Sequence, residues 1–172
     1  MAQHFNISGE LTQQLIAPGL SDHRINKISL TNVQKVGKCK VDLFIQKVDY
    51  EKVYLLKNVE LPIGATLVYD DARIKSSRGE FGLYIKLTDG ASFELTGDIN
   101  PTDDSTTVTG TNTLFLSEIS PGDELEVTGE TKEVRYVASD TSLTINTTYS
   151  GSLATDLTPT CNPQALVDVI VS

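Results

Sequence analysis

The chain contains two histidines, so a general base built on imidazole would have to use His4 or His23. His23 closes the run Ser21-Asp22-His23, which holds the three residue types of a nucleophilic triad. The members of a triad converge on one reacting atom from different elements, whereas three neighbours in a turn point in different directions. We therefore expect a polar surface turn at this run and place His4 on an N-terminal arm.

Oxygen ligands at closely spaced positions, Asp98, Asn100, Asp103 and Asp104, form the best candidate for a metal site. Hard oxygen ligands of this kind suit Ca²⁺. The run also contains Pro101, and it lacks the glycine and the glutamate that complete a known calcium loop. We expect a solvated linker here, with a calcium site as the alternative, and no metal or cofactor elsewhere.

Tyrosines offer ring faces for stacking on sugars and anchors for a protein interface. The chain has six of them and no Trp, which weakens the sugar interpretation: Tyr50, Tyr54, Tyr69, Tyr84, Tyr136 and Tyr149. We expect Tyr54, Tyr69 and Tyr84 to lie on strand faces in or beside a core.

The two cysteines, Cys39 and Cys161, lack the CxxC or Cys/His spacing of a zinc site. Cys39 opens an apolar alternation and is expected to be a small buried hydrophobe, with a disulfide to Cys161 as the alternative. The sequence contains no phosphate-binding loop, dinucleotide-binding fingerprint, zinc-protease motif or nucleophile elbow. We therefore expect no enzymatic activity.

Acidic residues concentrate late in the chain. Residues 91–160 hold 12 Asp and Glu against 2 Lys and Arg, whereas the remainder holds 11 against 12. Such asymmetry indicates separate modules. A net charge of −9 gives no electrostatic footprint for nucleic acid, so we expect no direct binding to it. Neither a run of 18 apolar residues nor a leader-like N-terminus occurs, so we expect synthesis in a cytoplasm without a membrane anchor.

Period-two alternation of apolar and polar residues dominates the chain and predicts strands. The clearest runs, each able to bury one face, are 39–45, 81–87 and 167–171, and further strands are expected at 25–31, 52–57 and 65–70. The predicted fold class is all-β: an antiparallel, jelly-roll-like β-sandwich.

Short strands with glycine corners fill the acidic block. They are expected at 105–110, 124–128, 132–138 and 142–147, with a tight hairpin at Gly129-Glu130. Strands this close together predict a small β-barrel-like domain. The apolar segment 164–172 is more like the N-terminal part, so we expect the chain to return there. The sandwich would comprise 25–90 plus 163–172, and the inserted acidic, Thr-rich small β domain 91–162, placed before the last strand.

Residues 1–24 are expected to form an N-terminal arm. The stretch 5–19 is the one weakly helical candidate, through Leu11, Leu15 and Ile16, and Pro18 would end it. Two interpretations stay open: an arm without defined structure, or an arm that docks on a neighbouring subunit through these three apolar residues.

A set of strand-like runs carries a resemblance: INKISLTN at 25–32, VDLFI at 41–45, YLLKNVELPIGA at 54–65, LYIKL at 83–87 and VDVIV at 167–171. In these runs the chain resembles small virion structural proteins of tailed bacteriophages, notably marine cyanophages. In that group the equivalent of Leu87 leads almost directly into the equivalent of Val167, whereas here 79 residues separate them. The inserted part resembles a small β module that recurs in phage tail, fibre and adaptor proteins, through TTVTG at 106–110, GDEL at 122–125 and SDTSLT at 139–144.

The resemblance implies a non-enzymatic structural protein of the virion, with no catalytic residues to carry over. We expect a capsid decoration or head-fibre component, with a neck or tail/baseplate accessory as the alternative. The implied partners are other virion proteins (major capsid, neck or tail proteins) and further copies of the chain in a homo-oligomer, a closed ring or trimer. A host surface glycan is a further candidate partner, and a free carbohydrate-binding β-sandwich module is the alternative of another class.

Overall fold

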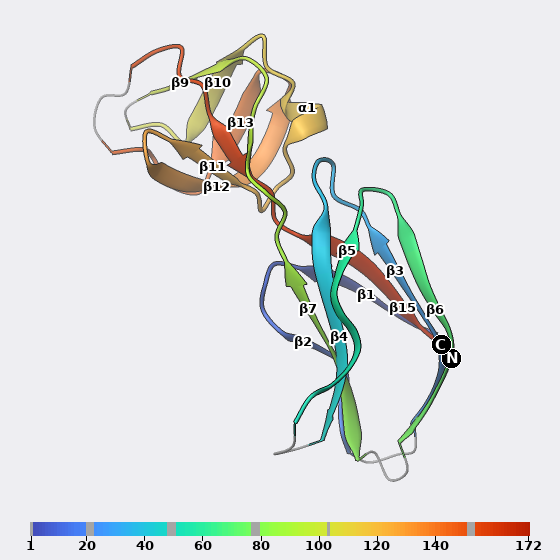
Figure 1. Cartoon of the computed structure of the whole chain (residues 1–172). Coiled ribbons are helices and arrows are strands. Elements are labelled where there is room, and N and C mark those ends of the chain that lie inside the picture. The colour runs from blue at the N-terminus through green and yellow to red at the C-terminus, as the bar shows by residue number, and fades with distance from the viewer. Residues whose placement is uncertain (1, 20–22, 48–50, 77–79, 103, 151–153) are drawn as a thin grey trace. The chain divides into compact units, whose positions relative to one another are not determined.

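The computed structural model describes residues 2–19, 23–47, 51–76, 80–102, 104–150 and 154–172 (Figure 1). The chain is all-β with antiparallel sheets, as the alternation predicts. Its elements in chain order are β1 Gln3–Ser8, β2 Gln13–Ile16, β3 His23–Asn32, β4 Cys39–Lys47, β5 Val53–Leu61, β6 Thr66–Ser76, β7 Phe81–Thr88, β8 Phe93–Glu94, β9 Asp98–Pro101, β10 Thr107–Thr111, α1 Phe115–Glu118, β11 Glu124–Val127, β12 Glu130–Ser139, β13 Ser142–Ile145, β14 Thr160–Asn162 and β15 Leu166–Val171.

The chain divides into two compact units. The first, called the sandwich unit below, comprises Met1–Gln34, Lys38–Asp89 and Ala165–Ser172. The second, called the inserted unit, comprises Lys35–Gly37 and Gly90–Gln164. Each unit has its own hydrophobic core, and no buried residue is shared between the two cores.

In the described part of the sandwich unit, eight strands form two four-stranded sheets ordered β1-β15-β3-β6 and β2-β7-β4-β5. When the eight strands are numbered by sequence within this unit, the neighbours run 1-8-3-6 and 2-7-4-5. This order is that of a jelly roll, in which two Greek keys interleave across two sheets. The inserted unit therefore interrupts the last crossover of a jelly roll, between its seventh and eighth strands.

Alternation along the strands explains why these sheets bury a common core. On β4 the buried positions Cys39, Val41 and Leu43 face inward, and on β7 the corresponding positions are Leu83, Ile85 and Leu87. β15 contributes Val167, Val169 and Val171 to the same core. A side-chain period of two places these residues on one face of each strand, as the sequence predicts.

The expected N-terminal arm is corrected by the structure, because residues 1–24 belong to the sandwich unit. β1 pairs with β15, matching Ile7 with Val167, and β2 pairs with β7, matching Gln13 with Ile85. The helical expectation for 5–19 is wrong. The four-residue spacing of Leu11 and Leu15 suggested a helix, but a turn and a strand produce the same spacing here.

The point where the chain leaves and re-enters the sandwich unit is held by a carboxylate. The Ala165 backbone N–H donates to Asp89 Oδ1 at 2.6 Å, and the Asp89 N–H donates to Glu10 Oε1 at 3.0 Å. In Figure 1 the red strand β15 then runs between β1 and β3, with Val169 matched to Phe5 and Leu30.

This carboxylate gives the sandwich unit a testable pH dependence. Burial raises the pKa of Asp89, the Ala165 N–H lowers it, and nearby Glu10 raises it, with a net upward shift. A raised folded-state pKa means that Asp89 keeps its proton to higher pH in the folded state than in the unfolded state. The stability contributed by protonated Asp89 is therefore lost as pH rises through the folded pKa. Asp89→Asn keeps the acceptor for Ala165 and removes the charge. We expect its Tm to exceed that of the wild type at pH 7, with the difference shrinking as pH falls towards 4. A difference that grows on acidification would contradict this account.

Seven strands of the inserted unit follow one another in the order β8-β14-β11-β12-β13-β10-β9. A bridge joins Ile99 in β9 to Leu157, whose backbone groups exchange hydrogen bonds of 2.8 and 3.1 Å. β11 and β12 form a hairpin through Thr128 and Gly129, both at positive φ (51° and 82°), which is the geometry of a type I′ turn. The hairpin was expected one residue later, at Gly129-Glu130.

The core of the inserted unit is small and contains Phe115, Ile119, Leu125 and Leu143, all at 0% exposure. Phe115 opens the short helix α1, where its backbone N–H donates to Asp140 O at 3.3 Å. The linker expected around Asp98 is wrong, because Asp98–Pro101 is strand β9 and pairs with β10.

Candidate functional site

The described members of the calcium candidate, Asp98, Asn100 and Asp104, do not form a possible metal-binding group. Ser21, Asp22 and Asp103 lie outside the described residues, and so does the side chain of His23. His4 lies on β1 with its Nε2 4.0 Å from Asp168 Oδ1, and its side chain is 63% exposed. Among the residues that the structure describes, no group of three or more His, Cys, Asp and Glu side chains could hold a metal ion.

The described calcium candidates form hydrogen bonds within the inserted unit. Asp98 Oδ1 accepts from Thr158 Oγ1 at 3.1 Å, and Asn100 Oδ1 accepts from the Asp156 N–H at 2.9 Å. Together with the Ile99–Leu157 bridge these bonds fasten β9 to the segment before β14. Asp104 is exposed and has a positive φ of 60°. The alternating oxygens at 98 and 100 therefore hold a strand edge in place.

The three interface candidates have different environments. Leu11 is 81% exposed, in the turn between β1 and β2. Leu15 is 5% exposed and belongs to the core of the sandwich unit, and Ile16 packs against that core. Leu15 and Ile16 are thus used within their own chain, and Leu11 is the one of the three that is free to meet a partner.

The cysteines are separate and buried. Cys39 lies in the core of the sandwich unit and Cys161 in the core of the inserted unit, and both are free thiols, each 1% exposed. Burial raises the pKa of the Cys39 thiol to about 11, and burial likewise raises the pKa of Cys161, assisted by Asp123 and Glu118. Cys39 is the small buried hydrophobe that its alternation predicts.

An aromatic cluster covers the outer face of the sheet β2-β7-β4-β5. Phe44, which is 1% exposed, is matched in register to Tyr54 on β5 and to Tyr84 on β7. The rings of Phe44 and Tyr84 are nearly parallel, with their centroids 5.6 Å apart. The rings of Phe44 and Tyr54 are tilted relative to each other, with their centroids 5.5 Å apart. Gln14 Nε2 donates to the Tyr84 hydroxyl at 2.8 Å. These contacts fix the three rings on the sheet.

Lysines surround this cluster. Lys52 Nζ lies 4.3 Å from the Phe44 ring centroid, and Lys57 Nζ lies 4.7 Å from that of Tyr54. We call this surface the lysine face, because its charged residues comprise five lysines and two acids: Lys38, Lys40, Lys52, Lys57, Lys86, Asp42 and Glu60.

The other tyrosines are placed differently. Tyr69 packs against the sandwich core, and Tyr50 lies outside the described residues. Tyr149 is buried in the inserted unit, where its hydroxyl donates to Leu125 O at 3.0 Å, and burial raises its pKa. Tyr136 is 61% exposed. Phe44 thus has Tyr84 on one side and Lys52 near its ring, so the cluster presents ring edges and ammonium groups to solvent more than open ring faces.

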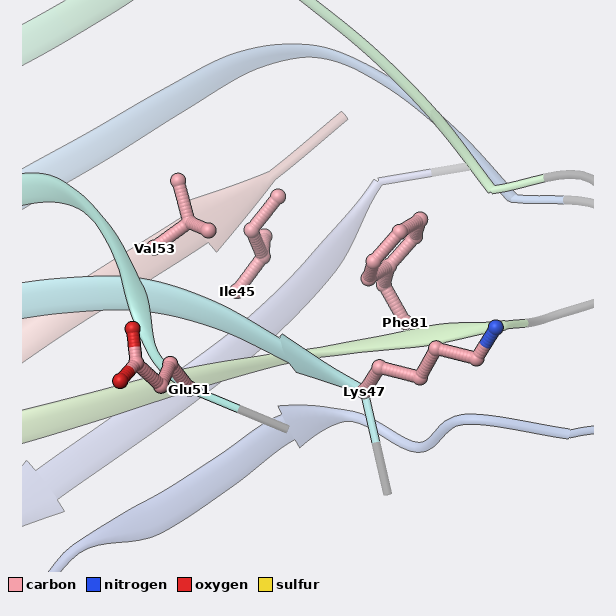
Figure 2. Close-up of a pocket in the computed structure, with 5 residues that line it drawn as sticks. All are labelled: Ile45, Lys47, Glu51, Val53 and Phe81. Atoms are coloured by element: carbon pink, nitrogen blue, oxygen red, sulfur yellow. The ribbon is translucent and has the colours of Figure 1, made fainter. Parts of the chain in front are cut away.

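A pocket of about 490 Å³ opens at one end of the sandwich unit (Figure 2). Ile45, Val53 and Phe81 point to the same side, and Lys47 and Glu51 stand at the edge. Ile45 and Phe81 continue the inward-facing rows of β4 and β7, so the pocket is where the core opens to solvent. Ligand sites normally combine apolar lining with several converging polar groups, whereas this lining offers one lysine and one glutamate.

Glutamates cover a second surface, on the strands β8-β14-β11-β12 of the inserted unit. Glu124 and Glu126 alternate with the buried residues Leu125 and Val127, so both point away from the core. In register, Glu124 lies opposite Glu133, and Thr160 lies between Glu126 and Glu94. We call this surface the glutamate face. Arg135, whose Nη1 is 3.3 Å from Glu133 Oε1, is the base paired with it among the described residues.

Three other carboxylates in the inserted unit accept hydrogen bonds from backbone N–H groups. Asp123 is 5% exposed, and its two oxygens accept from the Ser120 and Gln164 N–H groups at 2.7 and 2.9 Å. Glu130 accepts from Lys132 and from Ser150, which lowers its pKa, with the Lys132 bond as the largest cause. Asp140 accepts from the Leu116 N–H at 3.0 Å in α1. These acids close turns and helix ends.

Comparison of the chain with protein-family models, curated proteins and solved structures found no match. Within the described part of the chain, no helix is both long enough and apolar enough to span a membrane.

The sequence carries only indirect signals of these faces. Phe44 is an apolar residue at a polar position of the alternation 39–45, and Glu124 and Glu126 are acids alternating with core residues. Each signal identifies one strand. The residues that join it from other strands, such as Tyr84 beside Phe44, follow from strand pairing over long stretches of chain.

Proposed function

We propose that the chain is a non-enzymatic structural protein of a tailed-bacteriophage virion, placed on the outside of the head as a decoration or head-fibre component. The observation that carries this proposal is the jelly roll interrupted at its last crossover by a folded acidic unit. Jelly rolls are common in viral capsid proteins and lectins, which is an analogy at the level of the fold. The resemblance of the strand runs to virion proteins favours a viral structural protein over a lectin.

The division of charge supports a display role. The inserted unit holds 12 acidic and 3 basic residues, and the sandwich unit holds 11 of each. A strongly acidic surface remains soluble when it is exposed, whereas a neutral unit is easier to cover with neighbours in an assembly. We therefore expect the sandwich unit to attach to the particle and the inserted unit to face solvent.

The buried and hydrogen-bonded acids favour a structural role over catalysis. The carboxylates of Asp123, Glu130 and Asp140 accept hydrogen bonds from backbone N–H groups of their own unit. The carbohydrate-binding alternative relied on tyrosine platforms, and the packing of Tyr84 against Phe44 argues against an open stacking face at Tyr84. A neck or tail/baseplate position is the alternative within the virion proposal.

Immunogold electron microscopy tests the proposal. Particles of a tailed phage that encodes this chain are labelled with antibody against the inserted unit, and antibody against the major tail protein serves as the positional control. Gold on facets or vertices is expected. Gold at the neck or tail would move the protein to the accessory position, and purified particles that lack both gold and the protein would overturn the virion proposal.

A further inference from the structure

The lysine face presents its charges in a fixed arrangement. The ammonium groups of Lys52 and Lys57 lie over the rings of Phe44 and Tyr54, within the range of cation–π attraction. Such contacts restrict two long side chains that would otherwise be mobile. Because less side-chain freedom remains to be lost, a partner that meets these charges is bound at lower entropic cost.

Rigid aromatic side chains give the same face a centre suited to a protein partner. Phe44 is held between Tyr84 and Tyr54, and the Tyr84 hydroxyl is engaged by Gln14. Tyrosine is enriched among the residues that dominate binding energy at protein interfaces, and charged residues commonly form the rim. The lysine face thus combines an aromatic centre with a cationic surround and a net charge of +3.

The glutamate face contains like-charge repulsion that one arginine compensates only in part. Glu124 and Glu133 lie directly opposite each other on antiparallel strands, an arrangement that is destabilising for like charges. With Glu94 and Glu126 the face carries four glutamates, and Arg135 is its paired base, for a net charge of −3. A cationic partner surface would relieve this repulsion.

We propose that the lysine face of one copy docks onto the glutamate face of a second copy. Both are faces of β-sheets, their net charges are equal and opposite, and Tyr54, which is 37% exposed beside the buried Phe44, supplies the apolar contact. The two surfaces differ, so the contact is heterologous and produces either a closed ring or an open chain of copies. This inference does not rest on the virion proposal, because self-association is a property of the purified chain.

Sedimentation of the full chain at several concentrations and salt levels tests the contact. We expect association that strengthens with concentration and weakens at high salt, as ion pairs near a surface do. Lys52→Glu with Lys57→Glu should weaken it by more than about tenfold. The matched control is Lys27→Glu with Lys75→Glu, two exposed lysines of the other sheet, which makes the same charge change and should leave association intact.

A charge swap makes the test specific to the two faces. Glu124→Lys with Glu126→Lys should also abolish self-association, and mixing this variant with Lys52→Glu/Lys57→Glu should restore a complex of the two. Circular dichroism establishes that each variant is folded. A wild-type chain that stays monomeric at all concentrations would overturn the proposal. So would equal weakening by the control pair, or a mixture of the two swapped variants that does not associate.

Discussion

Replacing Phe115 by alanine should unfold the inserted unit and leave the sandwich unit folded. Phe115 is fully buried in a core that shares no residue with that of the sandwich. Truncation of a buried phenylalanine costs about 3–5 kcal/mol. A core of this size rarely supplies more than about 3–5 kcal/mol of net stability, so the substitution removes most of it. Two-dimensional NMR should show dispersed amide signals disappearing for residues 90–164 and persisting for the eight sandwich strands.

The neighbours of Phe115 provide the control. Leu114 and Leu116 flank it and are 45% and 50% exposed, so Leu114→Ala and Leu116→Ala change the same segment without opening a cavity. Each should shift the stability of the inserted unit by less than about 0.5 kcal/mol. Loss of signals from both units together in Phe115→Ala would show that the units fold as one.

Deleting Gly90–Gln164 and joining Asp89 to Ala165 through a short glycine-rich turn should yield a folded jelly roll. All eight strands of the sandwich lie outside the deletion, and the Asp89 carboxylate already contacts the Ala165 N–H. Far-ultraviolet circular dichroism should show a β spectrum, and thermal unfolding should be a single cooperative transition. A product that is unfolded or aggregated would refute the nested arrangement.

A much smaller deletion should be more damaging. Removing Leu166–Ser172 takes away β15, which lies between β1 and β3 and contributes Val167, Val169 and Val171 to the core. Both flanking strands then lose a hydrogen-bonding partner along their length. We expect this truncated chain to remain unfolded, so the position in the sheet, and not the number of residues removed, decides the outcome.

Strand periodicity predicts the part of the fold in which one face is apolar over several residues. Segments 39–45, 81–87 and 167–171 are strands, with the predicted faces buried, and the all-β class follows from them. β1 was missed because Ile7 is its one buried position, so no apolar alternation marks it. β2 was missed because it has four residues and because Leu11, Leu15 and Ile16 repeat at a helical spacing. β9 was missed because Asp98 and Asn100 are poor strand formers, and their hydrogen bonds to 156–158 come from distant sequence.

The candidate sites depended on information that a single strand does not contain. The charge block at 91–160 is visible in the sequence, but its gathering of Glu94, Glu124 and Glu133 on one sheet is a result of register. Local side-chain chemistry offered only a run of triad residue types, expected to be a surface turn, and a calcium site as the alternative to a linker. The residues that form defined surfaces are instead ordinary lysines, tyrosines and glutamates, which strand pairing brings together.

The central place of β15 determines when this protein can finish folding during its synthesis. Because β15 follows the inserted unit in the chain, β1 and β3 have no partner between them until translation has passed through that whole unit. If that unit folds first, it brings its two ends together and replaces a loop of about 75 residues with a short connection. Loop-closure entropy then favours completion of the sheet by about 2–3 kcal/mol. The folded insert would thus hold the two ends of the interrupted crossover close together while the sheet is completed. Until then, the unpaired edges of β1 and β3 would be the sites at which nascent chains are prone to aggregate.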